Sequence, residues 1–139
     1  MEYRRFDNTV AVRLDPDEEI LEQLEKVVRA EKITLGHVSA IGAIKEFTIG
    51  VYSVPEQKYY STDYTGAWEV VSLIGNITTK EGEPYLHLHM SAADDNGKTA
   101  GGHLNRAIIS ATSEIFITVC NGSIERIKDP RTGLNVLKF

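Results

Sequence analysis

The stretch WEVVSLIGNIT, residues 68–78, decides the fold class, because its apolar residues alternate on both faces of a β-strand. Val71, Leu73 and Ile77 belong to one alternating set, and Trp68, Val70 and Ile74 belong to the other. A strand of this kind needs cover on both of its faces. One or two helices from a chain of 139 residues cannot cover both faces of a whole sheet, so we expect a homo-oligomer in which a second copy supplies the second cover.

β-Branched and aromatic runs, broken by Gly, Pro, Asn and Asp, surround this strand from His37 onward. The predicted strands are His37–Ile44, Phe47–Val54, Lys58–Thr62, Trp68–Thr78, Tyr85–Ala93 and Ile115–Val119. The turn segments between them are short, which favours antiparallel neighbours. The segment His103–Ser113 fits both a helical stripe and a strand, and we expect a short helix or turn that enters a strand.

A helix is predicted in the N-terminal half of the chain. The strand Thr9–Leu14 runs into the sequence DPDE, residues 15–18, in which Asp15, Pro16 and Glu18 form a capping box. Apolar residues at helical spacing follow, so we expect a helix that begins there, ends at about Lys32 and covers the sheet. The predicted fold class is α/β (α+β): a mainly antiparallel sheet with one long helix in the N-terminal half and one or two short helices. Residues 1–139 are expected to form a single domain.

Composition narrows the function classes. Lys and Arg number 15 against 20 Asp and Glu, for a net charge of −5, which disfavours direct nucleic-acid binding. Cys120 is the single cysteine and cannot close an intrachain disulfide. No apolar run follows the first arginines and none is long enough to span a bilayer, so we expect a cytoplasmic protein with no membrane partner.

Three of the four histidines fall in one predicted hairpin. In the strand Tyr85–Ala93 the apolar residues alternate with His87 and His89, which therefore share the face opposite to the core. After the turn at residues 94–98 the chain returns through Gly101 and Gly102, which permit close backbone approach, to His103. Three neutral imidazoles on adjacent strands suit Zn²⁺, so His87, His89 and His103 are the predicted metal ligands.

Other interpretations of these polar residues stay open. A His-x-His pair alone is more often part of a solvated strand face, and it is the third histidine that favours a metal site. His37 has no other histidine near it in the sequence and is interpreted as a structural residue of a strand. A site with three protein ligands leaves one position for water or a small ligand, which is typical of catalytic zinc. Acidic residues that could serve as general base are Glu69, Asp94, Asp95 and Glu114. Glu69 is the most suggestive, although a carboxylate at the edge of a strand that caps a backbone amide or pairs with an arginine is the preferred interpretation of it. No catalytic residue can be assigned.

The order of these motifs resembles the PPC (plants and prokaryotes conserved) domain family. The matching segments are RLDPDE (13–18), VSAIGAI (38–44), GAWEVVSLIGN (66–76), PYLHLHMS (84–91), GKTAGGHL (97–104) and a tail from Arg126 to Leu137 that contains Asp129, Thr132 and Gly133. The resemblance implies a homotrimer with a mainly antiparallel sheet. It also implies that His87, His89 and His103 are zinc ligands.

The resemblance carries a second implication, about DNA. Plant members join the domain to an AT-hook, an Arg-Gly-Arg-Pro segment that binds A·T-rich DNA, and stand-alone prokaryotic members share the DNA-binding label. This sequence contains no such segment. We therefore expect a zinc-binding homotrimer whose open coordination position serves a small ligand or a metal-assisted reaction. The alternative is a DNA-associated regulatory or assembly module in which zinc is structural.

Overall fold

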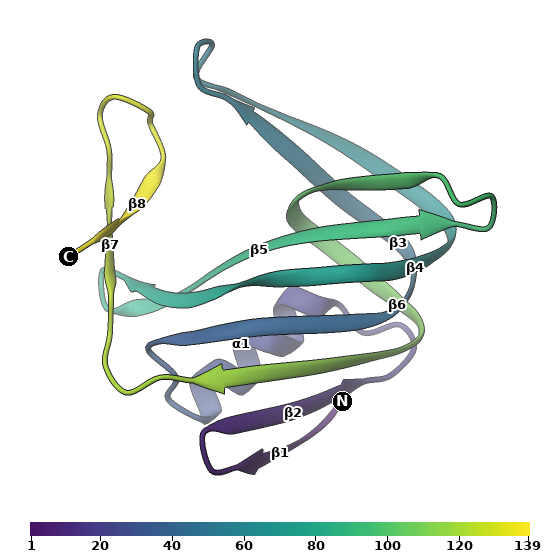
Figure 1. Cartoon of the computed structure of the whole chain (residues 1–139), viewed down its shortest axis with the longest axis horizontal. Coiled ribbons are helices and arrows are strands. Elements are labelled where there is room, and N and C mark those ends of the chain that lie inside the picture. Colours follow the sequence, from purple (N-terminus) through teal and green to yellow (C-terminus); the bar gives the residue numbers. More distant parts are fainter.

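Eight β-strands and one α-helix make up the structure, a computed structural model that describes all of residues 1–139 (Figure 1). The elements are β1 (Glu2–Phe6), β2 (Thr9–Leu14), α1 (Ile20–Ala30), β3 (Gly36–Ser53), β4 (Lys58–Lys80), β5 (Glu83–Asp94), β6 (Thr99–Val119), β7 (Glu125–Lys128) and β8 (Asn135–Lys138). The class is α+β, as predicted, with a sheet that is antiparallel except for one parallel bridge between β4 and β7.

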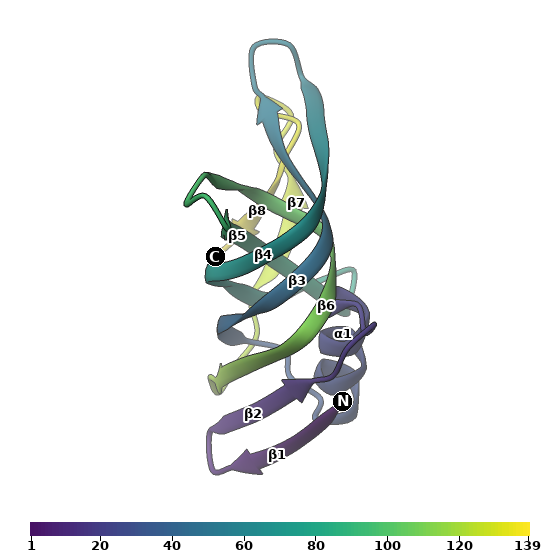
Figure 2. The same ribbon diagram turned by 90° about the vertical axis from the view of Figure 1, so that its right-hand side faces the viewer.

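The four long strands β3, β4, β5 and β6 pair in a closed ring, which forms the centre of the sheet. β3 pairs with β4, β4 pairs with β5, and β5 pairs with the beginning of β6. The remainder of β6 pairs with β3, on the edge of β3 that does not face β4, and the end of β6 also pairs with β2. Figure 2 shows the strong twist that this closure gives the strands, and the β3–β4 hairpin extends beyond the rest of the sheet. The short β7–β8 hairpin stands beside this centre at the C-terminal end (Figure 1).

Several predicted strands are parts of longer ones. His37–Ile44 and Phe47–Val54 merge into β3, and Lys58–Thr62 and Trp68–Thr78 merge into β4. Of the two register shifts in the β3–β4 pairing, the one at 44/46 coincides with the predicted break in β3, and the one at 40/42 lies inside the predicted strand His37–Ile44. A β-bulge interrupts the alternation of side chains without ending a strand, so the local pattern suggested an end that the sheet does not have.

The prediction of a short helix or turn at His103–Ser113 is wrong, because the whole segment lies within β6. Leu104, Ala107 and Ile109 are buried, at a spacing that differs from the strict alternation of a regular strand. The pairing of β6 with β3 shifts register three times in this region. These irregularities produce a burial spacing that imitates a helical stripe.

The predicted start of the helix is also wrong. Residues 15–18 form a turn in which the Glu18 carboxylate accepts hydrogen bonds from the Asp15 backbone N–H (2.9 Å) and the N-terminal ammonium of Met1 (2.7 Å). Asp17 has a φ of +71°, which breaks helical geometry there. The helix instead begins after Glu19, whose carboxylate caps the Glu22 N–H. With 11 residues, α1 is shorter than the predicted long helix, and the additional short helices are not found. No helix of the structure is long and apolar enough to cross a lipid bilayer.

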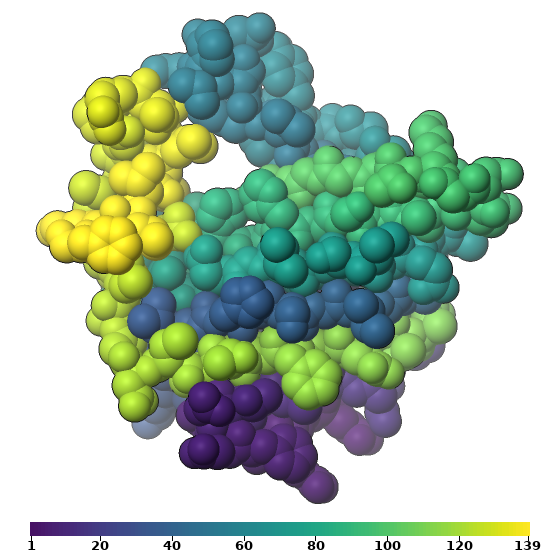
Figure 3. Space-filling model, viewed as in Figure 1, coloured from purple at the N-terminus to yellow at the C-terminus, as the bar shows by residue number.

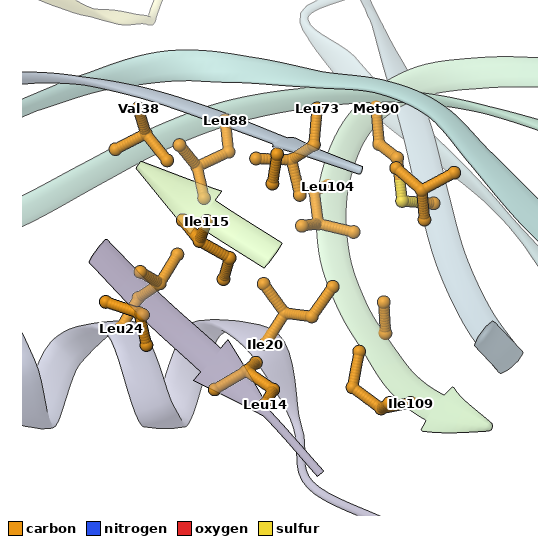
Figure 4. Packing of buried hydrophobic residues seen from close by; sticks show 14 of the residues in the cluster. Leu14, Ile20, Leu24, Val38, Leu73, Leu88, Met90, Leu104, Ile109 and Ile115 are labelled. Atoms are coloured by element: carbon orange, nitrogen blue, oxygen red, sulfur yellow. The ribbon is translucent and has the colours of Figure 1, made fainter. Parts of the chain in front are cut away.

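The helix packs its apolar stripe against the sheet and completes the core. Ile20, Leu24 and Val27 of α1 are fully buried, as are Ile115 and Ile117 of β6. Figure 4 shows Ile20 and Leu24 between the helix and the strands. These side chains belong to one cluster of 25 buried hydrophobic residues. Burial of each such side chain contributes about 1.5–3 kcal/mol, so this layer fixes β5 and β6, the two strands that carry the histidine hairpin.

The opposite face of the sheet is also apolar but lies open. The four residues of this outer apolar patch are Ile41, Val71, Ile74 and Phe116, which are 57%, 59%, 53% and 51% exposed. The register shift in β4 between Val70 and Ser72 turns Val70 and Leu73 to the core and Val71 and Ile74 to the outside. The strand 68–78 is therefore apolar on both faces, as predicted, but the predicted division of its residues is wrong. Because of the shift, Leu73 and Ile77 lie in the core with Trp68 and Val70, and Val71 lies outside with Ile74.

Candidate metal centre

The three hairpin histidines converge in the structure. His87 and His89 lie two residues apart on β5, and His103 on β6 is the direct cross-strand partner of His89. The ring centroids are 5.1–5.5 Å apart, and the nitrogen atoms that could bind an ion all lie within 4.8 Å of one another. His87 and His103 are half-buried, whereas His89 is exposed. The fourth histidine, His37, is exposed on β3 and lies outside this cluster.

The turn between β5 and β6 sets this convergence. The Asp94 side chain accepts hydrogen bonds from the backbone N–H of Asn96 (3.0 Å) and of Lys98 (2.8 Å). Gly97 has a φ of +76°, a left-handed conformation that glycine adopts without strain. The tight turn fixes the register that places His103 opposite His89.

Two glycines allow the neighbouring strands to approach the cluster. A Cβ atom on Gly75 of β4 would lie 2.0 Å from the backbone oxygen of His87. A Cβ atom on Gly102 of β6 would lie 2.8 Å from the backbone oxygen of Gly50. The close approach predicted for Gly102 is confirmed, and the role of Gly75 was not evident in the sequence because it depends on the twist of β4 against β5.

One pair of donor atoms has the spacing of two ligands on a tetrahedral ion. Nε2 of His87 and Nε2 of His89 are 3.3 Å apart. Two nitrogens on a tetrahedral ion at 2.0–2.1 Å would be about 3.3 Å apart. Imidazole nitrogens also match zinc and similar transition metals better than magnesium or calcium, which prefer oxygen ligands. The residues present therefore suit a transition-metal ion with one position left for a further ligand.

The electrostatics of the cluster keep two of the rings neutral. Burial, and then the charges of His103, Arg126 and His89, lower the pKa of His87 from 6.5 to about 4. Burial, and then His89, also lower the pKa of His103. A neutral imidazole has a free lone pair, which is the form that binds a metal. Both rings are therefore ready as ligands at neutral pH.

A cavity of about 840 Å³ opens beside the cluster. In Figure 3 it corresponds to the hollow between the yellow C-terminal hairpin, the β3–β4 hairpin and the middle of the sheet. Besides the three histidines, its lining consists of Gly50, Val51, Tyr52, Tyr59, Asn76, Tyr85, Gly102, Arg126, Gly133, Leu134, Asn135, Val136 and Leu137. Aromatic, amide and aliphatic groups thus surround the histidines, and one charged side chain joins them.

No carboxylate lines this cavity, so none of the four candidate general bases reaches it. Glu69 is exposed and pairs with Ala93, several residues along β4 from the Asn76–His87 pair. Glu114 lies on the outer face beside Phe116. Asp94 belongs to the turn that it stabilises, next to Asp95. These four residues were candidates because they were expected to lie near the histidines. The sequence did not show at which end of its strand, or on which face of the sheet, each carboxylate lies.

Arg126 is the charged residue that the sequence did not single out as part of the site. It is 6% exposed and comes from β7, which follows β6. Its guanidinium donates to Thr78 Oγ1, to Asn76 Oδ1 and to the Asn135 backbone oxygen, each at 2.8 Å. Burial lowers the pKa of Arg126. The β7–β8 hairpin therefore delivers a desolvated positive charge to the cavity.

The contacts of Arg126 link it to the histidine cluster. Its guanidinium lies over the Tyr85 ring, 4.7 Å from the centroid. Its Nη2 is 3.5 Å from Nδ1 of His87, while Nε2 of the same ring faces His89. On the far side of the cavity, Tyr59 stands edge-on to His103 with centroids 6.2 Å apart. Trp68 packs edge-on against Phe47 in the core and does not line the cavity.

Comparison with solved structures supports both the fold and its association with metal. A candidate DNA-binding protein from Bacteroides thetaiotaomicron has a TM-score of 0.96 at 28% identity, with 99% of this chain and 96% of that chain covered. A metal-containing protein from Archaeoglobus fulgidus has a TM-score of 0.88 at 29% identity, with 99% and 97% covered. The fold of this chain thus occurs in a protein that holds a metal.

Sequence comparison identifies the family. A curated relative, the bifunctional protein GlmU of Synechococcus sp. strain JA-3-3Ab, is 31% identical over an alignment of 128 residues that covers 88% of this chain. This chain spans about a fifth of the length of that relative, 19%. The family model of the Plants and Prokaryotes Conserved (PCC) domain, the PPC family of the resemblance above, matches residues 1–121. The chain therefore belongs to the Plants and Prokaryotes Conserved domain family.

Proposed function

We propose that this protein binds one Zn²⁺ per chain through His87, His89 and His103. The observation that carries the proposal is the convergence of three imidazoles, with donor atoms within 4.8 Å, at the edge of a cavity with no carboxylate. The similar protein from Archaeoglobus fulgidus is described as metal-containing, which supports a metal in this chain too. Zinc is the metal that three imidazoles with one open position suit best.

His87, His89 and His103 line a cavity, so we propose that a small molecule binds beside the ion that they would hold. A bound zinc ion would supply a Lewis acid at its open coordination position. The residues of the chain supply the surroundings: Tyr85 and Asn135, joined by a 3.2 Å hydrogen bond, can orient a ligand, and the aliphatic lining residues offer it apolar contacts. With no carboxylate at hand, we assign no general base and no reaction.

The zinc content of untagged protein tests this proposal. Elemental analysis of protein purified without chelators or added metal is expected to give close to one zinc ion per chain. Metal-free protein should take up one equivalent in a titration against a zinc-binding dye. A protein that neither contains zinc nor binds it would contradict the proposal.

We further propose that the protein is a homotrimer, as the family resemblance implies, and that the outer apolar patch forms its subunit interface. Patches of this kind are typical of subunit interfaces. The exposed and free Cys120 suits a reducing compartment, so we expect the trimer to work in the cytoplasm.

An Ile74→Asp substitution at the centre of the patch is expected to yield monomers, because it would bury three unpaired charges in the assembled interface. Val54→Asp is the matched control, since Val54 is 43% exposed but lies at the tip of the β3–β4 hairpin, which extends beyond the rest of the sheet (Figure 2). Sedimentation equilibrium should give about three times 15.5 kDa for the wild type and the control, and 15.5 kDa for Ile74→Asp. A monomeric wild type would contradict the trimer.

DNA binding is the second candidate function, favoured by the description of the similar Bacteroides thetaiotaomicron protein. The net charge of −5 argues against it, because binding to DNA rests largely on neutralising phosphates. We expect no complex with an A·T-rich duplex in a mobility-shift assay at near-physiological salt. A complex that persists at both low and near-physiological salt would instead favour a regulatory module with structural zinc.

A further inference from the structure

Arg126 is a buried cation without a counter-ion. It is 6% exposed, and its hydrogen-bond partners Thr78, Asn76, Asn135 and His87 are all neutral groups. A charge in such a place normally has an ionic partner, because neutral acceptors recover only part of its hydration. The chain itself supplies no such partner, and the cavity that Arg126 lines contains no carboxylate.

The guanidinium also keeps a free donor. Arginine has five N–H groups, and the three bonds of 2.8 Å use one each on Nε, Nη1 and Nη2. Nη2 also lies 3.5 Å from Nδ1 of His87. With a metal ion on Nε2 the neutral ring would carry its proton on Nδ1, so this nitrogen would no longer accept the second N–H of Nη2. One N–H of Nη1 therefore has no acceptor within the chain. Because the other contacts hold the guanidinium in place, this donor is positioned before any ligand arrives.

The rest of the cavity suits an organic molecule better than a small inorganic ion. Its volume of about 840 Å³ lies in the range of sites for small organic ligands. Seven of its 16 lining residues are hydrophobic, among them Leu134, Val136 and Leu137 on the side of the C-terminal hairpin. A ligand that fills this space would have an apolar body and one negative group.

We propose that the cavity binds a small organic carboxylate whose anionic group pairs with Arg126 beside the histidine cluster. The inference rests on the proposed function in one respect, since a zinc ion at the histidines would add a second positive charge to the same cavity. The role of Arg126 does not depend on zinc, because it follows from the burial of a guanidinium that has no counter-ion in the chain. If Arg126 only tied β7 to β4 and β8, any preference for a carboxylate would come from the zinc ion alone and would survive in Arg126→Gln.

Benzoate and benzamide are suitable probes, because they have nearly the same shape and differ in charge. Isothermal titration of zinc-loaded protein at pH 7.5 is expected to show benzoate binding at least about tenfold more tightly than benzamide. In Arg126→Gln the affinity for benzoate should fall about tenfold or more while that for benzamide stays unchanged. Arg126→Lys keeps the charge and should retain part of the preference.

The outcomes separate the two proposals. Zinc content and the circular dichroism spectrum are measured on each sample, so a loss of metal or fold is seen directly. Equal affinities for benzoate and benzamide in the wild type would overturn the carboxylate site, and this comparison needs no variant to fold. Benzoate preference that survives in a folded Arg126→Gln sample would also overturn it. A protein that takes up no zinc yet shows an Arg126-dependent preference for benzoate would support the carboxylate site and contradict the zinc proposal.

Discussion

A His87→Ala, His89→Ala double variant is expected to lose almost all of its zinc. It leaves only His103 of the three donors, and one imidazole cannot hold the ion against solvent and buffer. Loss of a residue that only hydrogen-bonds to a metal ligand typically lowers the metal affinity about 10–100-fold. Loss of two direct ligands should therefore lower the zinc affinity by more than about 100-fold. Elemental analysis of untagged protein, followed by zinc titration with a competing chelator, measures the effect.

His37→Ala is the matched control for this variant. His37 is a histidine of the same sheet, is exposed, and lies outside the cluster, so its removal should leave the zinc content unchanged. The double variant is expected to fold, because the core residues of β5, Leu88 and Met90, stay in place. Equal zinc in the wild type and the double variant would rule out the ligand assignment.

Gly75→Ala is expected to destabilise the protein by about 3 kcal/mol or more, or to prevent folding. The added Cβ would lie 2.0 Å from the His87 backbone oxygen and 2.8 Å from the Leu88 Cα. Backbone atoms cannot move aside as a flexible side chain can, so β4 and β5 must separate. For a chain of this length the melting temperature should fall by roughly 10 °C, which thermal unfolding followed by circular dichroism would show.

Gly101→Ala serves as the comparison for Gly75→Ala. Gly101 also lies on a strand next to the cluster, but its Cβ would approach no closer than 3.2 Å, to the Met90 backbone oxygen. That contact is tight but needs a shift of only a few tenths of an ångström, so the loss of stability should be clearly smaller. If Gly75→Ala were as stable as Gly101→Ala, the close approach of β4 to His87 would be wrong.

The part of the candidate site that the sequence revealed is the part governed by local rules. Alternation in β5 placed Leu88, Met90 and Ala92 inside, as they are, and therefore turned His87 and His89 to the other face. The turn at residues 94–98 then brought the next strand back beside the first. Both features depend on residues close together in the chain, and for this reason a single sequence contained enough information to predict the cluster.

The parts that the sequence did not reveal depend on distant contacts. Arg126 reaches the cavity only because β7 bridges to β4, where Glu125 pairs with Thr79 across 46 positions. No local pattern marks such a contact. The helix start was missed for a related reason: Glu19, which caps α1, is also held by the Ala107 N–H from β6, so tertiary contact moves the start beyond the capping box.

Anomalous diffraction from crystals of the untagged protein, recorded on both sides of the zinc absorption edge, tests the central claim most directly. The expected result is one peak per chain, present only above the edge, at 2.0–2.1 Å from a ring nitrogen of each of His87, His89 and His103. A map with no peak among these three rings, in crystals grown with one equivalent of zinc, would contradict the metal centre.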